Sequence, residues 1–154
     1  MVAEIGAGKT GLRLSPLTPA NDAKQDSDPQ ALFNPVVGQL APLRLAYLHV
    51  IEGATGGARA GAPFDYDALR SRFKHGNEPG AWMVNNRSTR QMALDVVATG
   101  QADLVAFGKP FISNPDLVQR LRADAPLAAL NPKTLCGGGA AGYLDYPALA
   151  VETA

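Results

Sequence analysis

A glycine and a lysine stand together where an apolar run gives way to a helix start, in the segment VAFGKPFISNPDL from Val105 to Leu117. Gly108 allows another group to approach the backbone closely. Lys109 places a cation beside a helix N-terminus, which also attracts negative charge. The pair predicts an anion site. The alternative is that Gly108 only turns the chain and Lys109 is a solvated surface charge.

A second cation lies inside an apolar run. Arg13 stands between Leu12 and Leu14, so in a strand its side chain points away from theirs. A buried guanidinium is costly unless it is paired. Arg13 therefore either meets a carboxylate in the core or faces a negative or electron-rich ligand. His49, in the next apolar run, is either a hydrogen-bonded core residue, with Glu52 as an available partner, or a catalytic group.

Four short apolar runs must position these side chains, and each is too short for a helix. They cover residues 11–15, 45–51, 81–84 and 104–107. Nearly continuous apolar character, as in the second and fourth runs, is typical of parallel strands covered on both faces.

Helical patterns lie between and after these runs. Residues 30–43 carry apolar side chains at helical spacing, namely Leu32, Val36, Leu40 and Leu43, and residues 64–73 form a second candidate. A capping box of Ser88 and Gln91 predicts a third helix. Asn114-Pro115-Asp116 predicts the start of the last one, with a cap, a proline and an acid in order.

The order of elements is βαβαβαβα, which predicts an α/β fold. A (β/α)8 barrel needs eight such units over about 250 residues, and this chain has 154 residues. Half a barrel and a small open doubly wound sheet are the two architectures that fit. In barrels, phosphate often binds in the loops after the last two strands, which here are residues 85–88 and 107–110. Each loop carries one cation, Arg87 or Lys109.

Composition excludes several classes of function. Lys plus Arg equals Asp plus Glu at 14 each, so nucleic-acid binding has no support. No apolar run reaches the roughly 18 residues of a membrane span, and the N-terminal ten residues contain no signal-peptide core. The single Cys136 cannot form an internal disulfide. These features predict a cytoplasmic protein without a membrane segment.

Several stretches together resemble the Old Yellow Enzyme family of FMN-dependent ene-reductases. They are GLRLSP from Gly11, LAYLHV from Leu45, ADLVAFGKPFISNPDL from Ala102 and GGGAAGYLDYP from Gly137. The resemblance implies the C-terminal half of that family's (β/α)8 TIM barrel, with four βα units corresponding to strands five to eight. Residues 1–154 are then one partial barrel domain that holds FMN.

The resemblance also implies roles for individual residues. Arg13 matches the family arginine beside the flavin ring, where a cation stabilises negative charge on the reduced flavin. Phe107, Gly108 and Lys109 match the segment that holds the FMN phosphate. Most family members have arginine at the position of Lys109, so an ammonium replaces a bidentate guanidinium here.

The other phosphate loop departs from the family pattern. Asn85 and Asn86 match it, but Arg87 and Ser88 follow where the family often has glycine and an aromatic residue. Arg87 is therefore a candidate for direct phosphate contact. Cys136 stands where a family tyrosine borders the substrate pocket, so the resemblance implies a more open pocket there.

The resemblance implies an oxidoreductase that passes hydride from NAD(P)H through FMN to an electron-poor alkene. No segment before Arg13 matches the family's proton-donor tyrosine or its His/Asn clamp, so we expect no catalytic residue and no metal ligand in this chain. The alternatives are a non-catalytic flavin- or phosphate-binding half-barrel and an inactive truncated gene product.

Half a barrel has two unpaired strand edges, because only closure removes them. We therefore expect self-association or pairing with a separate N-terminal half-barrel.

Overall fold

The computed structural model describes residues 1–19, 24, 26–55, 63–76, 78, 80–135 and 137–149. The chain divides into two compact units, Met1–Ala106 and Phe107–Ala154. The first unit contains the sheet. The second contains short helices followed by an irregular segment.

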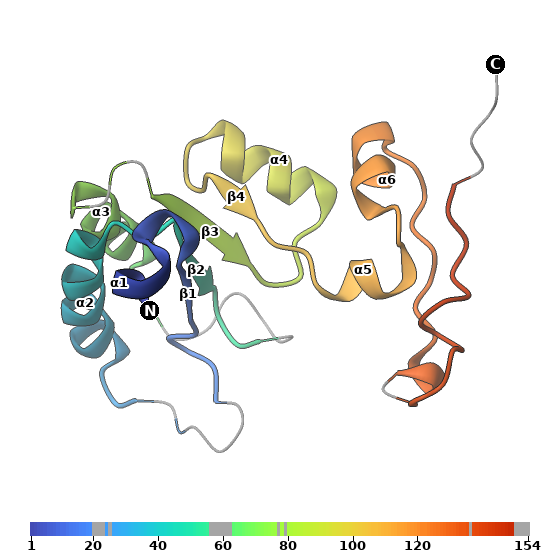
Figure 1. Ribbon diagram of the computed structural model, residues 1–154, viewed down its shortest axis with the longest axis horizontal. Helices are drawn as coiled ribbons and strands as arrows, with labels where there is room; N and C mark the ends of the chain where they lie inside the picture. The colour runs from blue at the N-terminus through green and yellow to red at the C-terminus, as the bar shows by residue number, and fades with distance from the viewer. Residues whose placement is uncertain are drawn as a thin grey trace. The chain divides into compact units, whose positions relative to one another are not determined.

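The sheet has four strands that all run parallel, in the same order as in the sequence (Figure 1). The strands are β1 (Gly11–Leu14), β2 (Tyr47–Ile51), β3 (Ala81–Asn85) and β4 (Leu104–Val105). The predicted α/β fold with a parallel sheet is confirmed. Among the described residues, β1 and β4 are each paired on one side only.

Helix α2 (Pro29–Leu40) begins where Asp28 accepts a hydrogen bond from the Ala31 N–H at 3.0 Å. Its Pro35 does not end the helix. The predicted apolar stripe is only partly correct: Leu40 packs against the core, but Leu32 is 46% exposed and Leu43 is 44% exposed, while Val37 is fully buried. Phe33 helps to set the buried face, because its ring packs edge-on against the ring of Phe64, with 6.5 Å between the ring centroids.

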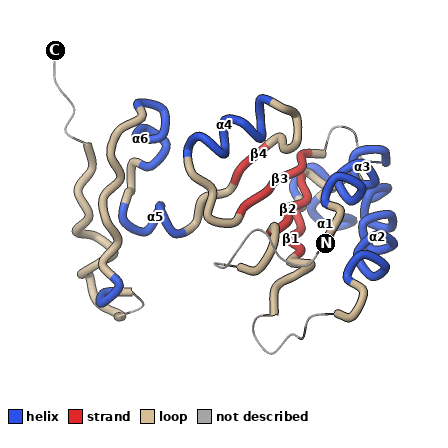
Figure 2. The backbone as a smooth tube through the Cα atoms, turned by 180° about the vertical axis from the view of Figure 1, so that it is seen from behind, coloured by secondary structure: helices blue, strands red, loops and turns tan. Residues whose placement is uncertain are grey.

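Helices α2 and α3 (Tyr66–Gly76) pack together on one face of the sheet. Figure 2 shows the same arrangement from behind. The core between these helices and the sheet consists of alternate strand residues, helix residues and Ala102 from the loop before β4. Its members are Val37, Leu48, Val50, Leu69, Phe73, Trp82, Val84 and Ala102. Alternation along a strand sends every second side chain to this face. Burying each large side chain contributes about 1.5–3 kcal/mol.

The N-cap of helix α4 (Arg90–Ala98) lies one residue later than predicted, at Thr89 instead of Ser88. Thr89 is the N-cap and accepts a hydrogen bond from the Met92 N–H at 3.2 Å. The predicted capping box of Ser88 and Gln91 is wrong, because the Gln91 amide donates to Asp95 at 2.7 Å instead. Gln91 thus stabilises the helix surface rather than its N-terminus.

The remaining elements are short. The first unit also has α1 (Val2–Ile5) and 3-10 turns at Ala7–Lys9 and Ala41–Leu43. The second unit has α5 (Lys109–Ser113), α6 (Leu117–Ala123) and a 3-10 turn at Pro132–Thr134. Over the described ranges, no helix combines the length and apolar character needed to cross a membrane.

Candidate functional site

The sheet face opposite the core carries a row of residues in register. Arg13 on β1 faces His49 on β2, His49 faces Met83 on β3, and Met83 faces Leu104 on β4. Leu104 is 44% exposed and Arg13 is exposed, whereas His49 and Met83 are half-buried. Asn85 lies two residues beyond Met83 and therefore shares this face. One sheet face thus brings together a cation, an imidazole and an amide.

Arg13 has no ion pair with a carboxylate within the described part of the chain. Of the two alternatives open from the sequence, a core ion pair is therefore not found among these residues. The guanidinium lies on the row just defined, beside half-buried His49. A cation in this position is available to a negative or electron-rich group over the sheet.

His49 differs from a satisfied core histidine. Its Nε2 atom is buried and has no hydrogen-bond partner among the described residues, and the same holds for Oδ1 of Asn85. Burial lowers the pKa of His49, the neighbouring Asn85 side chain opposes this shift, and the positive charge of Arg13 lowers the pKa further. The imidazole is therefore neutral at neutral pH.

The loop after β3 is held by Asn86 rather than left open. The side chain of Asn86 is 3% exposed and donates from Nδ2 to the carbonyl oxygens of Glu52 at 2.6 Å and Ala54 at 2.9 Å. These bonds join the loops after β2 and β3. Arg87 follows with a φ of 53°, in the left-handed region that favours glycine. Arg87 thus adopts a conformation that is less costly for glycine.

The second unit begins with Phe107, Gly108 and Lys109. The other described candidate site residues belong to the first unit. Gly108 is the N-cap of α5 and provides no side-chain cap. A Cβ added at Gly108 would meet nothing within 4 Å, so the backbone is accessible there. Lys109 is exposed and has no ion pair among the described residues.

Cys136 lies outside the described residues, so the structure says nothing of its predicted place at a substrate pocket. Two tyrosine hydroxyl groups accept hydrogen bonds from backbone N–H groups. The Tyr66 hydroxyl accepts from the Gly53 N–H at 2.7 Å, and the Tyr146 hydroxyl accepts from the Asn131 N–H at 2.9 Å. Asp145 accepts from the Gly142 N–H at 2.7 Å.

A cavity of about 270 Å³ lies at the N-terminal end of α3 and reaches Trp82 and Val96. Trp82 belongs to the core face of the sheet, so this cavity is not on the face of Arg13 and His49. Its carboxylates have structural partners: Asp65 caps α3 by accepting from the Ala68 N–H, and Asp67 pairs with Arg70. Among the described residues, no group of His, Cys, Asp and Glu could hold a metal ion.

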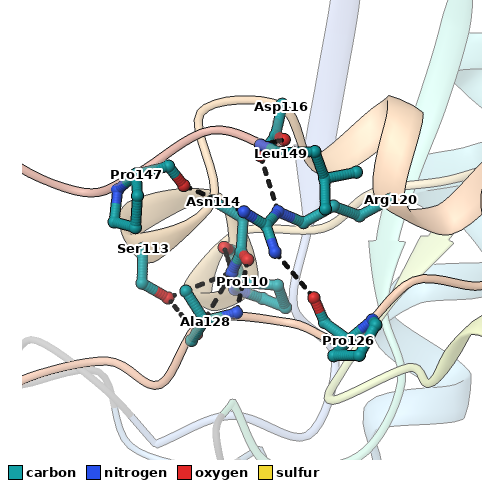
Figure 3. A network of polar contacts seen from close by, with 9 residues as sticks. All are labelled: Pro110, Ser113, Asn114, Asp116, Arg120, Pro126, Ala128, Pro147 and Leu149. Atoms are coloured by element: carbon teal, nitrogen blue, oxygen red, sulfur yellow. Dashed lines mark hydrogen bonds and ion pairs between the residues drawn. The ribbon is translucent and has the colours of Figure 1, made fainter. Parts of the chain in front are cut away.

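A buried polar network in the second unit was not predicted from the sequence (Figure 3). Arg120 is 7% exposed, and Asn114 is 1% exposed. The Asn114 amide donates to the carbonyl oxygen of Pro110 at 2.8 Å and accepts from the Ala128 N–H at 2.7 Å. Asn114 therefore joins α5 to the irregular segment, and its predicted role as the cap of the next helix is wrong. The only sequence signal was Arg120 spaced four residues after Asp116.

Comparison with known proteins identifies the family. The model of the NADH:flavin oxidoreductase / NADH oxidase family matches residues 1–128. The chain is 39% identical to 12-oxophytodienoate reductase 7 of Oryza sativa subsp. japonica, covering 97% of this chain and 40% of that protein. It is 35% identical to a probable flavin mononucleotide-dependent alkene reductase of Leishmania infantum, covering 96% of this chain and 38% of that protein.

Solved structures agree. The old yellow enzyme from Trypanosoma cruzi superposes with a TM-score of 0.84 at 34% identity, covering 97% of this chain and 37% of that one. Morphinone reductase superposes with a TM-score of 0.82 at 32% identity, and the match covers 96% of this chain and 38% of that one. The chain thus spans about two fifths of the length of the relatives it matches. It belongs to the NADH:flavin oxidoreductase / NADH oxidase family, and within it to the FMN-dependent Old Yellow Enzymes.

Proposed function

We propose that this chain is the FMN-binding C-terminal half of an Old Yellow Enzyme-type barrel, in which hydride passes from NAD(P)H through FMN to an electron-poor alkene. The observation that carries the proposal is the row on the open sheet face, where Arg13 lies beside half-buried His49 without a carboxylate partner among the described residues. Four parallel strands are half the number that closes such a barrel.

The residues on this face are suited to a flavin. Its ring presents nitrogen and oxygen atoms along one edge, and two buried polar atoms here lack partners among the described residues, His49 Nε2 and Asn85 Oδ1. When bound, FMN supplies the ability to accept and donate hydride. Arg13 would hold the ring through its guanidinium and stabilise negative charge beside it.

Each of the two loops that carry a cation is by itself a candidate for binding the phosphate group. Gly108 leaves the start of α5 without a side-chain cap, and Lys109 adds a positive charge there. Phe107 precedes them and would line the same site. In the other loop, Asn85 and Arg87 would contribute polar contacts, while the Asn86 amide braces the loop through Glu52 and Ala54. The role of Asn86 would then be to fix the loop rather than to donate its amide to phosphate.

The acid that protonates the alkene lies, on this proposal, outside the 154 residues. It would come from a separate N-terminal half-barrel, since a second copy of this chain could pair with the free strand edges but would lack the same acid. The single-sided pairing of β1 and β4 supports such a partner, because free strand edges readily pair with another chain. Light scattering at micromolar concentration tests this, and a stable monomer would contradict self-association.

The site favours a second candidate, a flavin-binding module without catalysis. Every residue assigned above would bind or orient FMN, and none would donate a proton to the substrate. Two measurements are needed: the first tests both candidates, and the second separates them. Titration with FMN, followed by flavin fluorescence, should show saturable binding; a chain that binds no FMN contradicts both. Reduction of an enone by NADPH, with and without an added N-terminal half, then distinguishes the reductase from the module.

A further inference from the structure

Residues 52–55, which directly follow β2, are held by side chains from elsewhere in the first unit, and we call them the anchored segment. Each residue of the anchored segment has a backbone N–H or carbonyl group bonded to one of these side chains. The side chains are Thr18 after β1, Tyr66 at the start of α3 and Asn86 after β3. The anchored segment is therefore bonded toward both neighbouring strands and toward the helix layer.

Thr18 joins the loop after β1 to the anchored segment. Its hydroxyl donates to the carbonyl oxygen of Gly53 at 3.2 Å and accepts from the Thr55 N–H at 3.1 Å. The Thr55 hydroxyl lies 3.0 Å away. A hydroxyl has one hydrogen and two acceptor lone pairs, so Thr55 is the donor in this contact. Thr18 thus uses its full hydrogen-bonding capacity on the anchored segment.

Asn86 reaches the anchored segment from the loop after β3. Its Nδ2 donates to the carbonyl oxygens of Glu52 at 2.6 Å and Ala54 at 2.9 Å, which uses both amide hydrogens. Asn86 is 3% exposed, so water competes little for these bonds. The backbone adds another link, because the Glu52 N–H donates to the carbonyl oxygen of Asn85 at 3.2 Å.

Tyr66 holds the anchored segment to the helix layer. Its hydroxyl accepts from the Gly53 N–H at 2.7 Å, and its ring packs against Phe64 with 4.7 Å between the ring centroids. Gly53 has a φ of 69°, in the left-handed region that favours glycine. In this conformation its N–H binds Tyr66 while its carbonyl oxygen binds Thr18.

We propose that Thr18 and Asn86 are positioning residues, which join the loops after β1, β2 and β3 into one unit before a cofactor binds. Thr18 stabilises residues 85–87 through the anchored segment, because that segment is bonded to both side chains. Binding groups that are already held lose less conformational entropy when a ligand binds. The inference rests on the proposed function in that residues 85–87 contact the cofactor phosphate, whereas the joining of the loops is measured without FMN.

Amide hydrogen exchange, followed by NMR without FMN, tests the joining of the loops. Thr18→Val removes the hydroxyl and keeps the shape of the side chain. We expect exchange at Gly53 to become about tenfold faster. Exchange at Glu52 should also become faster, although its N–H is bonded to Asn85 and not to Thr18. Thr18→Ser keeps the hydroxyl and should restore slow exchange. Unchanged exchange at Glu52 in Thr18→Val overturns the proposal.

Asn86→Asp tests the other side of the anchored segment. An ionised carboxylate cannot donate to the carbonyl oxygens of Glu52 and Ala54, so exchange at Glu52 should again become faster. Either single change releases the same segment, so the two effects should not multiply in the double variant with Thr18→Val. Effects that multiply fully would show two independent contacts and overturn the proposal. If Asn86→Asp does not fold, Asn86→Ser, which keeps one donor, replaces it in the same comparison.

FMN binding gives an independent readout. Thr18→Val should bind FMN about tenfold more weakly, and Thr18→Ser should stay within about twofold of the unmodified protein. The control is Lys74→Met at the opposite edge of the sheet, where Lys74 pairs with Asp103 at 2.7 Å and donates to the Gly80 carbonyl oxygen at 2.9 Å. Lys74→Met should lower the melting temperature and leave the affinity for FMN unchanged.

The two possible failures are distinguishable. If Thr18→Val binds FMN as tightly as the unmodified protein, or if Lys74→Met loses as much affinity as Thr18→Val, the positioning role is overturned. An unmodified protein that binds no FMN contradicts the proposed function instead. The exchange rates at Glu52 then decide by themselves whether Thr18 and Asn86 join the loops.

Discussion

Arg120 Nε lies 2.7 Å from Oδ1 of Asp116, one helical turn earlier, and both side chains are only 8% exposed. The remaining guanidinium nitrogens donate to the carbonyl oxygens of Pro126 at 2.7 Å and Pro147 at 2.9 Å. Oδ2 of Asp116 accepts from the Leu149 N–H at 2.6 Å. One buried ion pair therefore holds the irregular C-terminal segment to α6 at three points.

Replacing this arginine should release the C-terminal segment. In Arg120→Gln the buried carboxylate of Asp116 loses its counter-charge, and at least one of the two carbonyl contacts is lost. We expect faster amide hydrogen exchange at Leu149 and Ala128 and a clear drop in the melting temperature. Arg122→Gln, at an exposed position on the same helix, is the matched control. Equal exchange rates in the two variants would show that the network does not hold the segment.

Acid should weaken the same unit. The hydrogen bonds from Arg120 and the Leu149 N–H lower the pKa of Asp116, and burial only partly opposes them. The unfolded carboxyl has a pKa of about 3.9, so the stabilisation by ionised Asp116 is complete above that value. It is lost as the pH falls through the lower folded pKa. Thermal melts between about pH 3 and pH 7 should therefore show a steeper acid loss in the unmodified protein than in Arg120→Gln; parallel curves would contradict this.

Gly11 should not tolerate a side chain. The ring of Tyr47 lies so close to Gly11 that an added Cβ would overlap it. Gly11→Ala should therefore destabilise the β1–β2 pair, by about 1–3 kcal/mol for an overpacked site. Gly8→Ala is the control, because a Cβ there meets nothing within 4 Å. Urea denaturation compares the two, and equal free energies of unfolding would mean that the Tyr47 ring moves aside freely.

Lys109→Ala should weaken FMN binding if the proposed phosphate site is correct. Loss of one charge-assisted hydrogen bond costs about 1–3 kcal/mol. Fluorescence titration at fixed ionic strength measures this change, since screening alters the contribution of an exposed charge. Lys133→Ala, an exposed lysine of the same unit, controls for net charge. If both variants bind FMN like the unmodified protein, Lys109 is not part of the site.

Local patterns were sufficient to predict the sheet. Each strand was recognisable because a buried parallel strand is a short apolar run, and β2 and β3 end within one residue of the predicted bounds. The start of α4 was harder, since Ser88 and Thr89 are both good caps and only the backbone conformation decides between them. The apolar face of α2 was misplaced for a related reason: the contact between Phe33 and Phe64 is not local.

The sequence by itself determined the α/β class, the order of four parallel strands and the family, because these depend on residue types and spacing along the chain. Only the tertiary structure decided which polar residues are buried and which residues they contact. The one local signal that distinguishes buried Arg120 from exposed Arg122 is Asp116 four residues before it, and the other partners, Pro126 and Pro147, come from a later segment. Likewise, the unpaired atoms of His49 and Asn85 become neighbours only when β2 and β3 align. Burial and pairing are properties of distant contacts, which a single sequence does not contain.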